Sequence, residues 1–141
     1  MNWVVFALFS AGALATADLC VKLAAGKLSN SLGLLIYGSC TFMTGLGWVV
    51  ADKLRGVDFF IQPNGVAAAV GVGVAFSAVT IGLYFTFGAG APLSLASPLV
   101  RIGGLLLASM VGLFLFQEAF TWRYMLGMVS AIGGVYLIIT R

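Results

Sequence analysis

Five apolar stretches, each about twenty residues long, constrain the fold of this 141-residue chain more than any other feature. A helix needs about 20 mainly apolar residues to cross the roughly 30 Å hydrocarbon core of a bilayer. Only helices and closed barrels satisfy their backbone hydrogen bonds in lipid, and these stretches lack the alternation of a barrel strand. The sequence therefore predicts an all-α integral membrane protein with transmembrane helices at about 3–25, 31–51, 65–88, 92–116 and 122–139.

The composition favours insertion into a membrane over folding in water. Hydrophobic residues make up 62% of the chain and charged residues only 8%, whereas a soluble domain carries about 25% charged residues. Polar side chains are too few to cover a water-facing surface, so we expect residues 1–141 to form one transmembrane domain in contact with lipid. In the last connection, Thr121 is a predicted N-cap for the fifth helix.

The tryptophans agree with five crossings of the membrane. With five crossings, Trp3, Trp48 and Trp122 all fall at the same membrane surface, where an aromatic belt is expected. Basic loop residues, whose excess normally marks the cytoplasmic side, are nearly balanced between the two surfaces. The sequence therefore leaves two alternatives open, which are one fixed orientation and insertion in both orientations.

Two opposite charges interrupt the apolar helices at similar predicted depths. Asp18 lies roughly 10 Å from the end of the first helix, and Arg101 lies roughly 12 Å into the fourth helix from the same surface. Lys22 follows Asp18 by four residues, so it shares the same helix face nearer the surface. We expect Arg101 to face the interior of the helix bundle and to pair with Asp18, directly or through water.

An intramembrane charge costs about 2.5–3.5 kcal/mol on insertion scales and by default marks a pathway or a binding site. Two structural alternatives stay open for this pair. One is a buried ion pair that only joins the first and fourth helices. The other is an extended Arg101 side chain whose guanidinium reaches towards the membrane surface.

Polar residues at helical spacing accompany the charges on three of the predicted helices. Each row taken singly is more typical of ordinary hydrogen bonds between packed helices, but three rows with a charged pair favour a water-filled cavity. The candidate residues for substrate binding and coupling are Arg101, Asp18, Lys22, Ser94, Ser97, Tyr37, Thr41 and Tyr84. On the fifth helix, Gly127 and Gly134 share one face and are candidates for a dimer interface.

The last two predicted helices resemble a known family. The segment APLSLASPLVRIGGLLLASMVGLFLFQEAFTWRYMLGMVSAIGGVYLI resembles the end of EamA-type proteins of the drug/metabolite transporter superfamily. Its most specific part is FQEAFTWRYMLG, which contains Glu118 and Trp122. The segment AGALATADLCVKLA is similar to the first helix of an EamA half, including Lys22. The resemblance covers nearly the whole chain through loose apolar patterns.

The resemblance implies that five helices form one half of an inverted-repeat, ten-helix transporter. A second copy of the chain would complete it most simply, and an antiparallel homodimer would recreate the inverted repeats with substrate near the midplane. A parallel dimer stays open as the alternative. The resemblance also implies a multi-pass protein in the plasma (inner) membrane of a prokaryote.

Small multidrug resistance transporters are relatives in the same superfamily, and they use a first-helix carboxylate that binds protons or cationic drugs. Asp18 occupies a similar place, and the spacing of Gly127 and Gly134 resembles the dimer seam of their last helix. Two departures matter, because the acid is aspartate rather than glutamate and Arg101 adds a positive charge. Arg101 and Lys22 make the site better suited to an anionic or zwitterionic metabolite than to a hydrophobic cation.

The sequence therefore predicts a small secondary transporter that moves a small polar or charged metabolite by alternating access of a dimer. Arg101 would bind the anionic group of the substrate, while Asp18 would hold Arg101 in the empty site and carry a coupling proton. Two alternatives are kept. One is a proton-coupled exporter of cationic compounds that uses Asp18, and the other is a non-transporting membrane subunit.

Other functions are disfavoured by the residue types present. The chain has no histidine, and its cysteines, Cys20 and Cys40, lie in apolar segments, so we expect no enzyme, no metal site and no cofactor beyond a coupled proton or ion. The two cysteines are predicted to be small core side chains, with a disulfide left open. The net charge of +3 comes from scattered residues, so we expect small-molecule and lipid partners and no nucleic acid.

Overall fold

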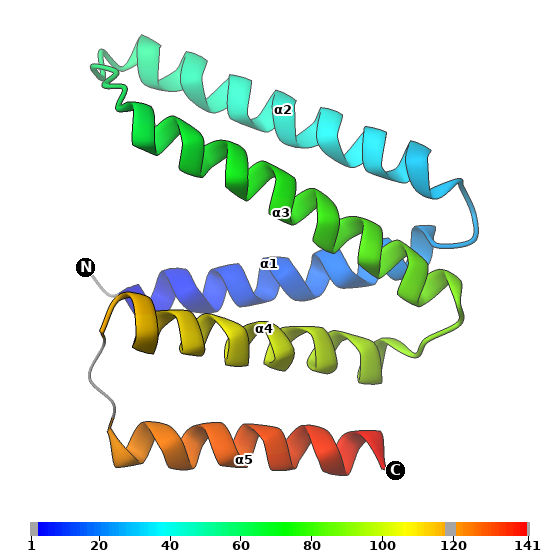
Figure 1. The fold of residues 1–141 in the computed structure, drawn as a ribbon. Coiled ribbons are helices and arrows are strands. Elements are labelled where there is room, and N and C mark those ends of the chain that lie inside the picture. Colours follow the sequence, from blue (N-terminus) through cyan, green and yellow to red (C-terminus); the bar gives the residue numbers. More distant parts are fainter. Residues whose placement is uncertain (1–2, 118–120, 141) are drawn as a thin grey trace. The chain divides into compact units, whose positions relative to one another are not determined.

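The computed structural model describes residues 3–117 and 121–140, and the elements within them are helices. They are α1 (Trp3–Ala24), α2 (Asn30–Leu54), α3 (Pro63–Gly88), α4 (Leu93–Leu115) and α5 (Trp122–Ile139), as Figure 1 shows. All five are long and apolar enough to cross a membrane. The prediction of an all-helical chain with five membrane-length helices is confirmed, and these helices indicate a multi-pass membrane protein.

The helix ends fall close to their predicted positions. The largest difference is in α2, which continues to Leu54 and so takes Asp52 and Lys53 into its last turn. Apolar content sets the predicted end, but a helix can continue into polar residues after its membrane-length stretch is complete. Thr121 is the N-cap of α5 as predicted, yet its side chain makes no capping hydrogen bond. Glu118 lies outside the described residues.

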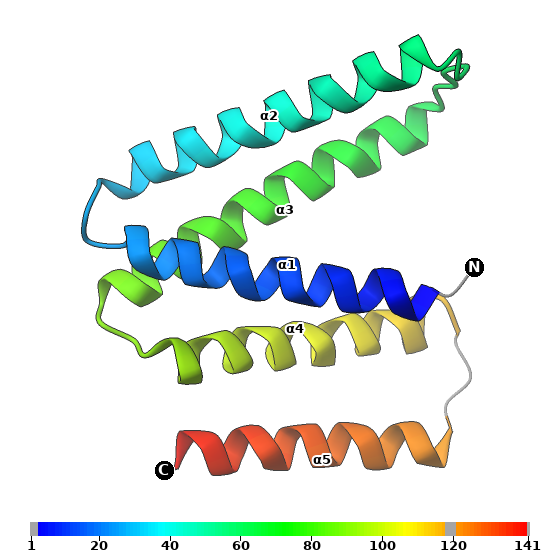
Figure 2. The same cartoon turned by 180° about the vertical axis from the view of Figure 1, so that it is seen from behind.

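The chain divides into two compact units, and the first contains residues 1–18 and 90–141. In this unit α4 and α5 pack side by side and run in opposite directions (Figures 1 and 2). The Ser109 hydroxyl on α4 lies 3.8 Å from the Met128 sulfur on α5. Met128 therefore marks the face of α5 that is turned towards α4.

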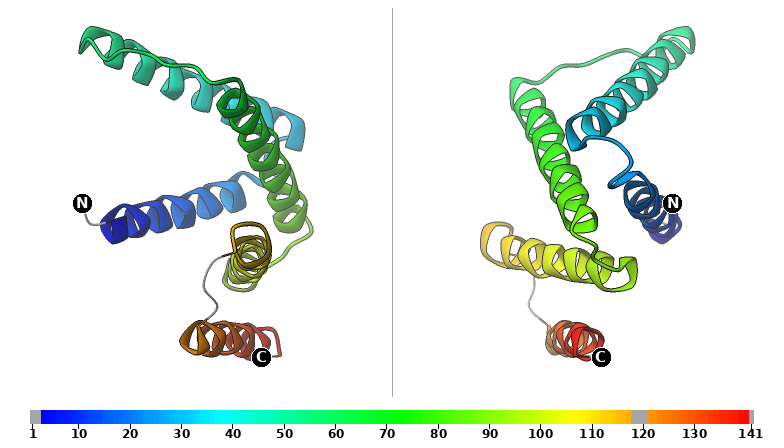
Figure 3. Two further views of the ribbon diagram at one scale, coloured as in Figure 1. Left: turned by 60° about the vertical axis from the view of Figure 1, so that its left-hand side comes forward. Right: turned by 90° about the vertical axis from the view of Figure 1, so that its right-hand side faces the viewer.

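The second unit contains residues 19–89, with α2 and α3 as its long helices. The two helices approach each other where α2 begins and α3 ends, and they diverge towards the loop 55–62 (Figure 3). Gly33 on α2 lies against Tyr84 on α3, and a Cβ atom at Gly33 would lie 2.5 Å from the Tyr84 Cζ atom. Because real Cβ contacts are essentially never that short, a side chain at this position would force the Tyr84 ring to shift.

Most apolar side chains of the described residues are exposed, including those of Trp3, Trp48 and Trp122 near helix ends. Among the described residues, the buried hydrophobic ones are Leu83, Tyr84, Phe87 and Ala96. Apolar helix surface is expected in lipid, where it is as well solvated as it would be by another helix. Cys20 and Cys40 are exposed and free, so the prediction of core cysteines is wrong.

The contact between Gly33 and Tyr84 generates a prediction about stability. Gly33→Ala places a methyl group inside the Tyr84 ring contact, and overpacking of this kind costs about 1–3 kcal/mol. Gly38→Ala is the matched control, because it makes the same change in the same helix where a Cβ meets nothing within 4 Å. We expect the melting temperature of Gly33→Ala in detergent to be lower than that of the wild-type protein, and that of Gly38→Ala not to be lowered. Intrinsic tryptophan fluorescence measures both. Equal melting temperatures would contradict the close contact.

Candidate functional site

The candidate site lies in the first unit, where α1 and α4 each contribute a charged side chain. Asp18 on α1 is 2% exposed, which is unusual for a carboxylate because an unpaired buried charge is strongly unfavourable. On α4, Ser97 and Arg101 are four residues apart and therefore share one face of the helix. The spacing of residues along α4 thus presents a hydroxyl and a guanidinium together.

Both oxygens of the Asp18 carboxylate accept a hydrogen bond from α4. Arg101 Nη2 donates to Asp18 Oδ1 at 2.6 Å, and the Ser97 hydroxyl donates to Asp18 Oδ2 at 2.5 Å. The predicted pairing of Asp18 with Arg101 is therefore present, and it is direct rather than through water. These two hydrogen bonds offset part of the free-energy cost of removing the carboxylate from water.

Arg101 is less completely enclosed than its partner. Its side chain is 35% exposed, against 2% for Asp18. Nη2 also lies 3.4 Å from the Leu14 carbonyl oxygen, one turn before Asp18 on α1. Among the described residues, the hydrogen bonds of this guanidinium all start from Nη2, so Nε and Nη1 keep N–H groups available for another acceptor.

The direction of the Arg101 side chain decides between two of the alternatives from the sequence. Its partners, Leu14 and Asp18, lie inside α1 and away from both helix ends. The guanidinium is thus held against a neighbouring helix and does not extend along α4 towards the membrane surface. The ion pair that joins α1 to α4 is compatible both with a structural strut and with a binding site.

Two further features of α4 lie beside the charged pair. Pro98 is inside the helix, directly after Ser97. A proline has no backbone N–H, so the carbonyl group of Ser94 lacks its usual helical donor. The Ser94 side chain is exposed, one turn before Pro98. The structure places Ser97 in direct contact with Asp18, whereas Ser94 lies only one turn before Pro98.

The other predicted site residues belong to the second unit and have local partners there. The Thr41 hydroxyl donates to the Tyr37 carbonyl at 3.0 Å within α2, which is an ordinary bond to the preceding helical turn. Tyr84 is buried against Gly33. The Lys22 ammonium lies over the Phe87 ring, 5.4 Å from its centre. These three contacts connect each residue to a neighbour within the second unit.

Sequence reasoning missed two residues that the structure brings into contact with the candidates. One is Leu14, which contributes only a backbone carbonyl and so carries no signal in its side chain. The other is Phe87, whose ring attracts the Lys22 cation. A signal for this contact existed, because the end of the third predicted helix and Lys22 fall near the same membrane surface.

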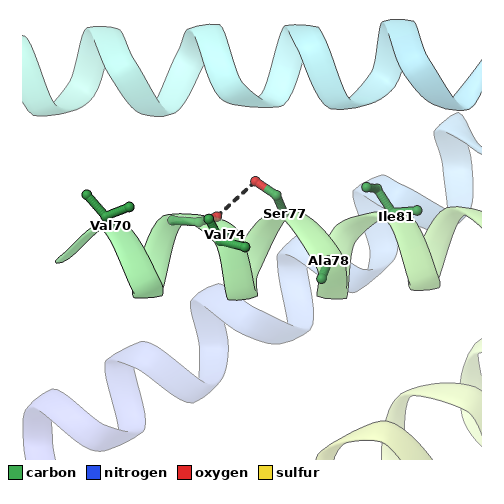
Figure 4. A pocket seen from close by; sticks show the side chains of 6 residues that line it. Val70, Val74, Ser77, Ala78 and Ile81 are labelled. Atoms are coloured by element: carbon green, nitrogen blue, oxygen red, sulfur yellow. Dashed lines mark hydrogen bonds between the residues drawn. The ribbon is translucent and has the colours of Figure 1, made fainter. Parts of the chain in front are cut away.

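A hollow of about 480 Å³ runs along α3 (Figure 4). Its lining residues come from α3 alone, and they are Val70, Gly73, Val74, Ser77, Ala78 and Ile81. The polar group among them, the Ser77 hydroxyl, donates to the Gly73 carbonyl of its own helix at 2.9 Å. The hollow therefore presents an apolar face with no charge for substrate recognition.

Among the described residues, no group of three or more His, Cys, Asp and Glu side chains is arranged to hold a metal ion. The chain matches no family model, no curated protein and no solved structure. The interpretation of the site therefore depends on the geometry of Asp18, Ser97 and Arg101.

The ion pair predicts strong coupling between two substitutions. Arg101→Gln leaves the Asp18 carboxylate buried without its cation, which costs about 3 kcal/mol in proteins where such pairs are broken, and somewhat less here because Arg101 is partly exposed. Adding Asp18→Asn removes the stranded charge, so the double variant should be more stable than Arg101→Gln alone. Unfolding in mixed detergent measures the free energies of all four proteins. Strictly additive effects would show that the two side chains do not interact.

Proposed function

We propose that this chain is the subunit of a secondary transporter, which moves a small anionic or zwitterionic metabolite across the membrane by alternating access of a dimer. The observation that carries the proposal is the difference between the two partners in the ion pair. Asp18 is enclosed with both oxygens engaged, whereas Arg101 is partly exposed and keeps unused N–H donors. The group offered to a ligand is therefore a cation.

This difference also weighs against an exporter of cationic compounds. Such a transporter needs an accessible carboxylate, but the Asp18 carboxylate is covered by Arg101 and Ser97. A cation that approached Asp18 would meet the positive charge of Arg101 first, and like charges at close range are costly. A carboxylate or phosphate group instead matches the planar fork of a guanidinium.

The open donors of Arg101 also weigh against a purely structural strut. A strut would be most stable with every N–H group satisfied inside the protein, because unsatisfied polar groups are unfavourable in lipid. Arg101 bonds through one nitrogen only among the described residues. Its remaining donors need water, a substrate or a second copy of the chain as their partner.

The exposed apolar surface and the small residues on α5 support assembly into a dimer. A Cβ atom at Gly127 or Gly134 would meet nothing within 4 Å. At 3.6 residues per turn, both glycines point roughly 100–120° away from Met128, which marks the side of α5 that contacts α4. The glycine face is thus not used against α4, and small residues allow a second helix to approach closely.

The balanced loop charges fit an antiparallel arrangement of the two copies. Two five-helix chains in opposite orientations would form the ten-helix inverted repeat of the EamA-type proteins that the sequence resembles. In this arrangement each copy would place its own Arg101 near the middle of the membrane. The plasma membrane of a prokaryote is the proposed location.

The proposal predicts that Arg101 is required for transport. Purified protein in proteoliposomes should take up some members of a panel of labelled carboxylates and amino acids, and Arg101→Gln should reduce this uptake at least tenfold. Ser77→Ala is the control variant, because Ser77 bonds only to its own helix among the described residues. Uptake that survives in Arg101→Gln, or uptake of organic cations alone, would contradict the assignment.

If α5 forms the dimer interface, larger side chains on its glycine face should weaken the dimer. Gly127→Leu and Gly134→Leu should each shift the protein from dimer to monomer, because a leucine side chain prevents close approach of the second helix. Gly133→Leu is the matched control, since a Cβ there also meets nothing within 4 Å but lies on another face. Single-molecule photobleaching in liposomes counts the copies. Equal dimer fractions for all three variants would exclude this interface.

A further inference from the structure

We propose that the Asp18–Arg101 pair couples each anion to one proton, so that anion and proton bind together and cross the membrane in the same direction. This inference rests on the proposed transport function and assigns its coupling ion. The ligand class is a small monoanion with two acceptor oxygens, such as a carboxylate. A single atom of Arg101, Nη2, holds the Asp18 carboxylate.

Nη2 belongs to both pairs of adjacent nitrogens, or forks, through which a guanidinium can bind two oxygens. An anion with two oxygens can bind arginine through Nη1 and Nη2 or through Nε and Nη2. Both modes use Nη2, each through a different one of its two N–H groups, and in the structure Nη2 donates to Asp18 Oδ1 at 2.6 Å and lies 3.4 Å from the Leu14 carbonyl oxygen. An anion that binds through the fork facing Asp18 therefore displaces the carboxylate from Arg101.

Binding of the anion changes the net charge of the site, and a proton can restore neutrality. In the empty site, Asp18⁻ and Arg101⁺ sum to zero. If an anion takes Arg101 while Asp18 stays ionised, the site carries one uncompensated negative charge, which is costly in a buried position. If a proton from water binds Asp18 at the same time, the site is neutral again. The empty and the fully loaded states are neutral, and both half-loaded states are charged.

Thermodynamic linkage turns this balance into coupling. A proton on Asp18 frees Nη2 and so raises the affinity for the anion, and by reciprocity the bound anion raises the affinity of Asp18 for the proton. On release, the proton returns to water and the Asp18 carboxylate pairs with Arg101 again. A monoanion then moves without net charge, whereas a zwitterion moves with one positive charge per cycle.

Ser97 suits both states of the carboxyl group. Its hydroxyl donates to Asp18 Oδ2 in the structure, and a hydroxyl can also accept a hydrogen bond from a protonated carboxyl group. The described charged groups near Asp18 are Arg101, from α4, and Lys22, four residues further along α1. Ser97 is therefore a positioning residue that keeps Asp18 enclosed while its proton comes and goes.

The first experiment measures binding and proton uptake in the wild-type protein. Gluconate and glucuronate serve as probes, because these carboxylates do not cross lipid unaided. Their affinity should rise up to tenfold for each pH unit lowered between pH 7.5 and 5.5, with about one proton taken up per anion in weakly buffered solution. Asp18→Asn should bind with an affinity that no longer depends on pH, and Arg101→Gln should not bind.

A second measurement locates the proton without altering the site. The chain has two other aspartates, Asp52 and Asp58, so in the Asp52→Asn/Asp58→Asn protein Asp18 is the only aspartate. Infrared difference spectra with ¹³C-aspartate should then show a carboxylic acid C=O band that appears when gluconate or glucuronate binds. In proteoliposomes, an inward proton gradient should drive uptake of that anion without a current.

The outcomes separate the coupling from the proposed function. Binding that requires Arg101 but is independent of pH, or monoanion uptake that carries current and moves no proton, would overturn the coupling and leave the transporter intact. If the wild-type protein binds neither probe at either pH, both the coupling and the anion-transport function are wrong. Binding with proton uptake and a new Asp18 C=O band would establish the coupling.

Discussion

The ion pair between Asp18 and Arg101 sets the relation of α1 to α4. Apolar side chains do not drive helices together in lipid, because the lipid tails are as apolar as leucine. A carboxylate that is 2% exposed and a guanidinium 2.6 Å away can meet in only a narrow range of helix rotation and depth. The Ser97 bond narrows that range further, since it fixes the second carboxylate oxygen. One polar cluster therefore specifies a packing that the surrounding apolar surface leaves undefined.

In the second unit, the packing of two apolar helices is defined by the shapes of their side chains rather than by an ion pair. Gly33 removes a side chain where the Tyr84 ring must fit, so α2 and α3 approach at one defined height. The Lys22 ammonium over Phe87 adds a directional contact at the end of α3. Towards the loop 55–62 the two helices diverge, and no contact of this kind is described there. The close contact between α2 and α3 thus lies at the end where α2 begins and α3 ends.

The sequence predicts the helices well because membrane thickness determines the length of each apolar stretch. It also predicts the Asp18–Arg101 pair, since matched depth and opposite charge are visible without a structure. It does not predict that Cys20 and Cys40 are exposed, or that Gly33 contacts Tyr84. These features depend on how each helix is rotated, and a helix that is apolar on all sides carries little information about rotation. The bond of Ser97 to Asp18, rather than to its own helix, is hidden for the same reason.

The chemical nature of the pair bears on what it is for. Two leucine side chains in place of Asp18 and Arg101 would avoid about 2.5–3.5 kcal/mol of insertion cost for each charge, and apolar replacements of buried ion pairs are often at least as stable. Stability alone is therefore a poor reason for charges at this depth. An ion pair differs from an apolar contact because a free ion can replace either member, provided that it carries the same sign of charge as the member that it replaces. In the proposed mechanism Arg101 exchanges Asp18 for an anion and Asp18 exchanges Arg101 for a proton, so the contact that fixes α4 against α1 would also be the one that releases it.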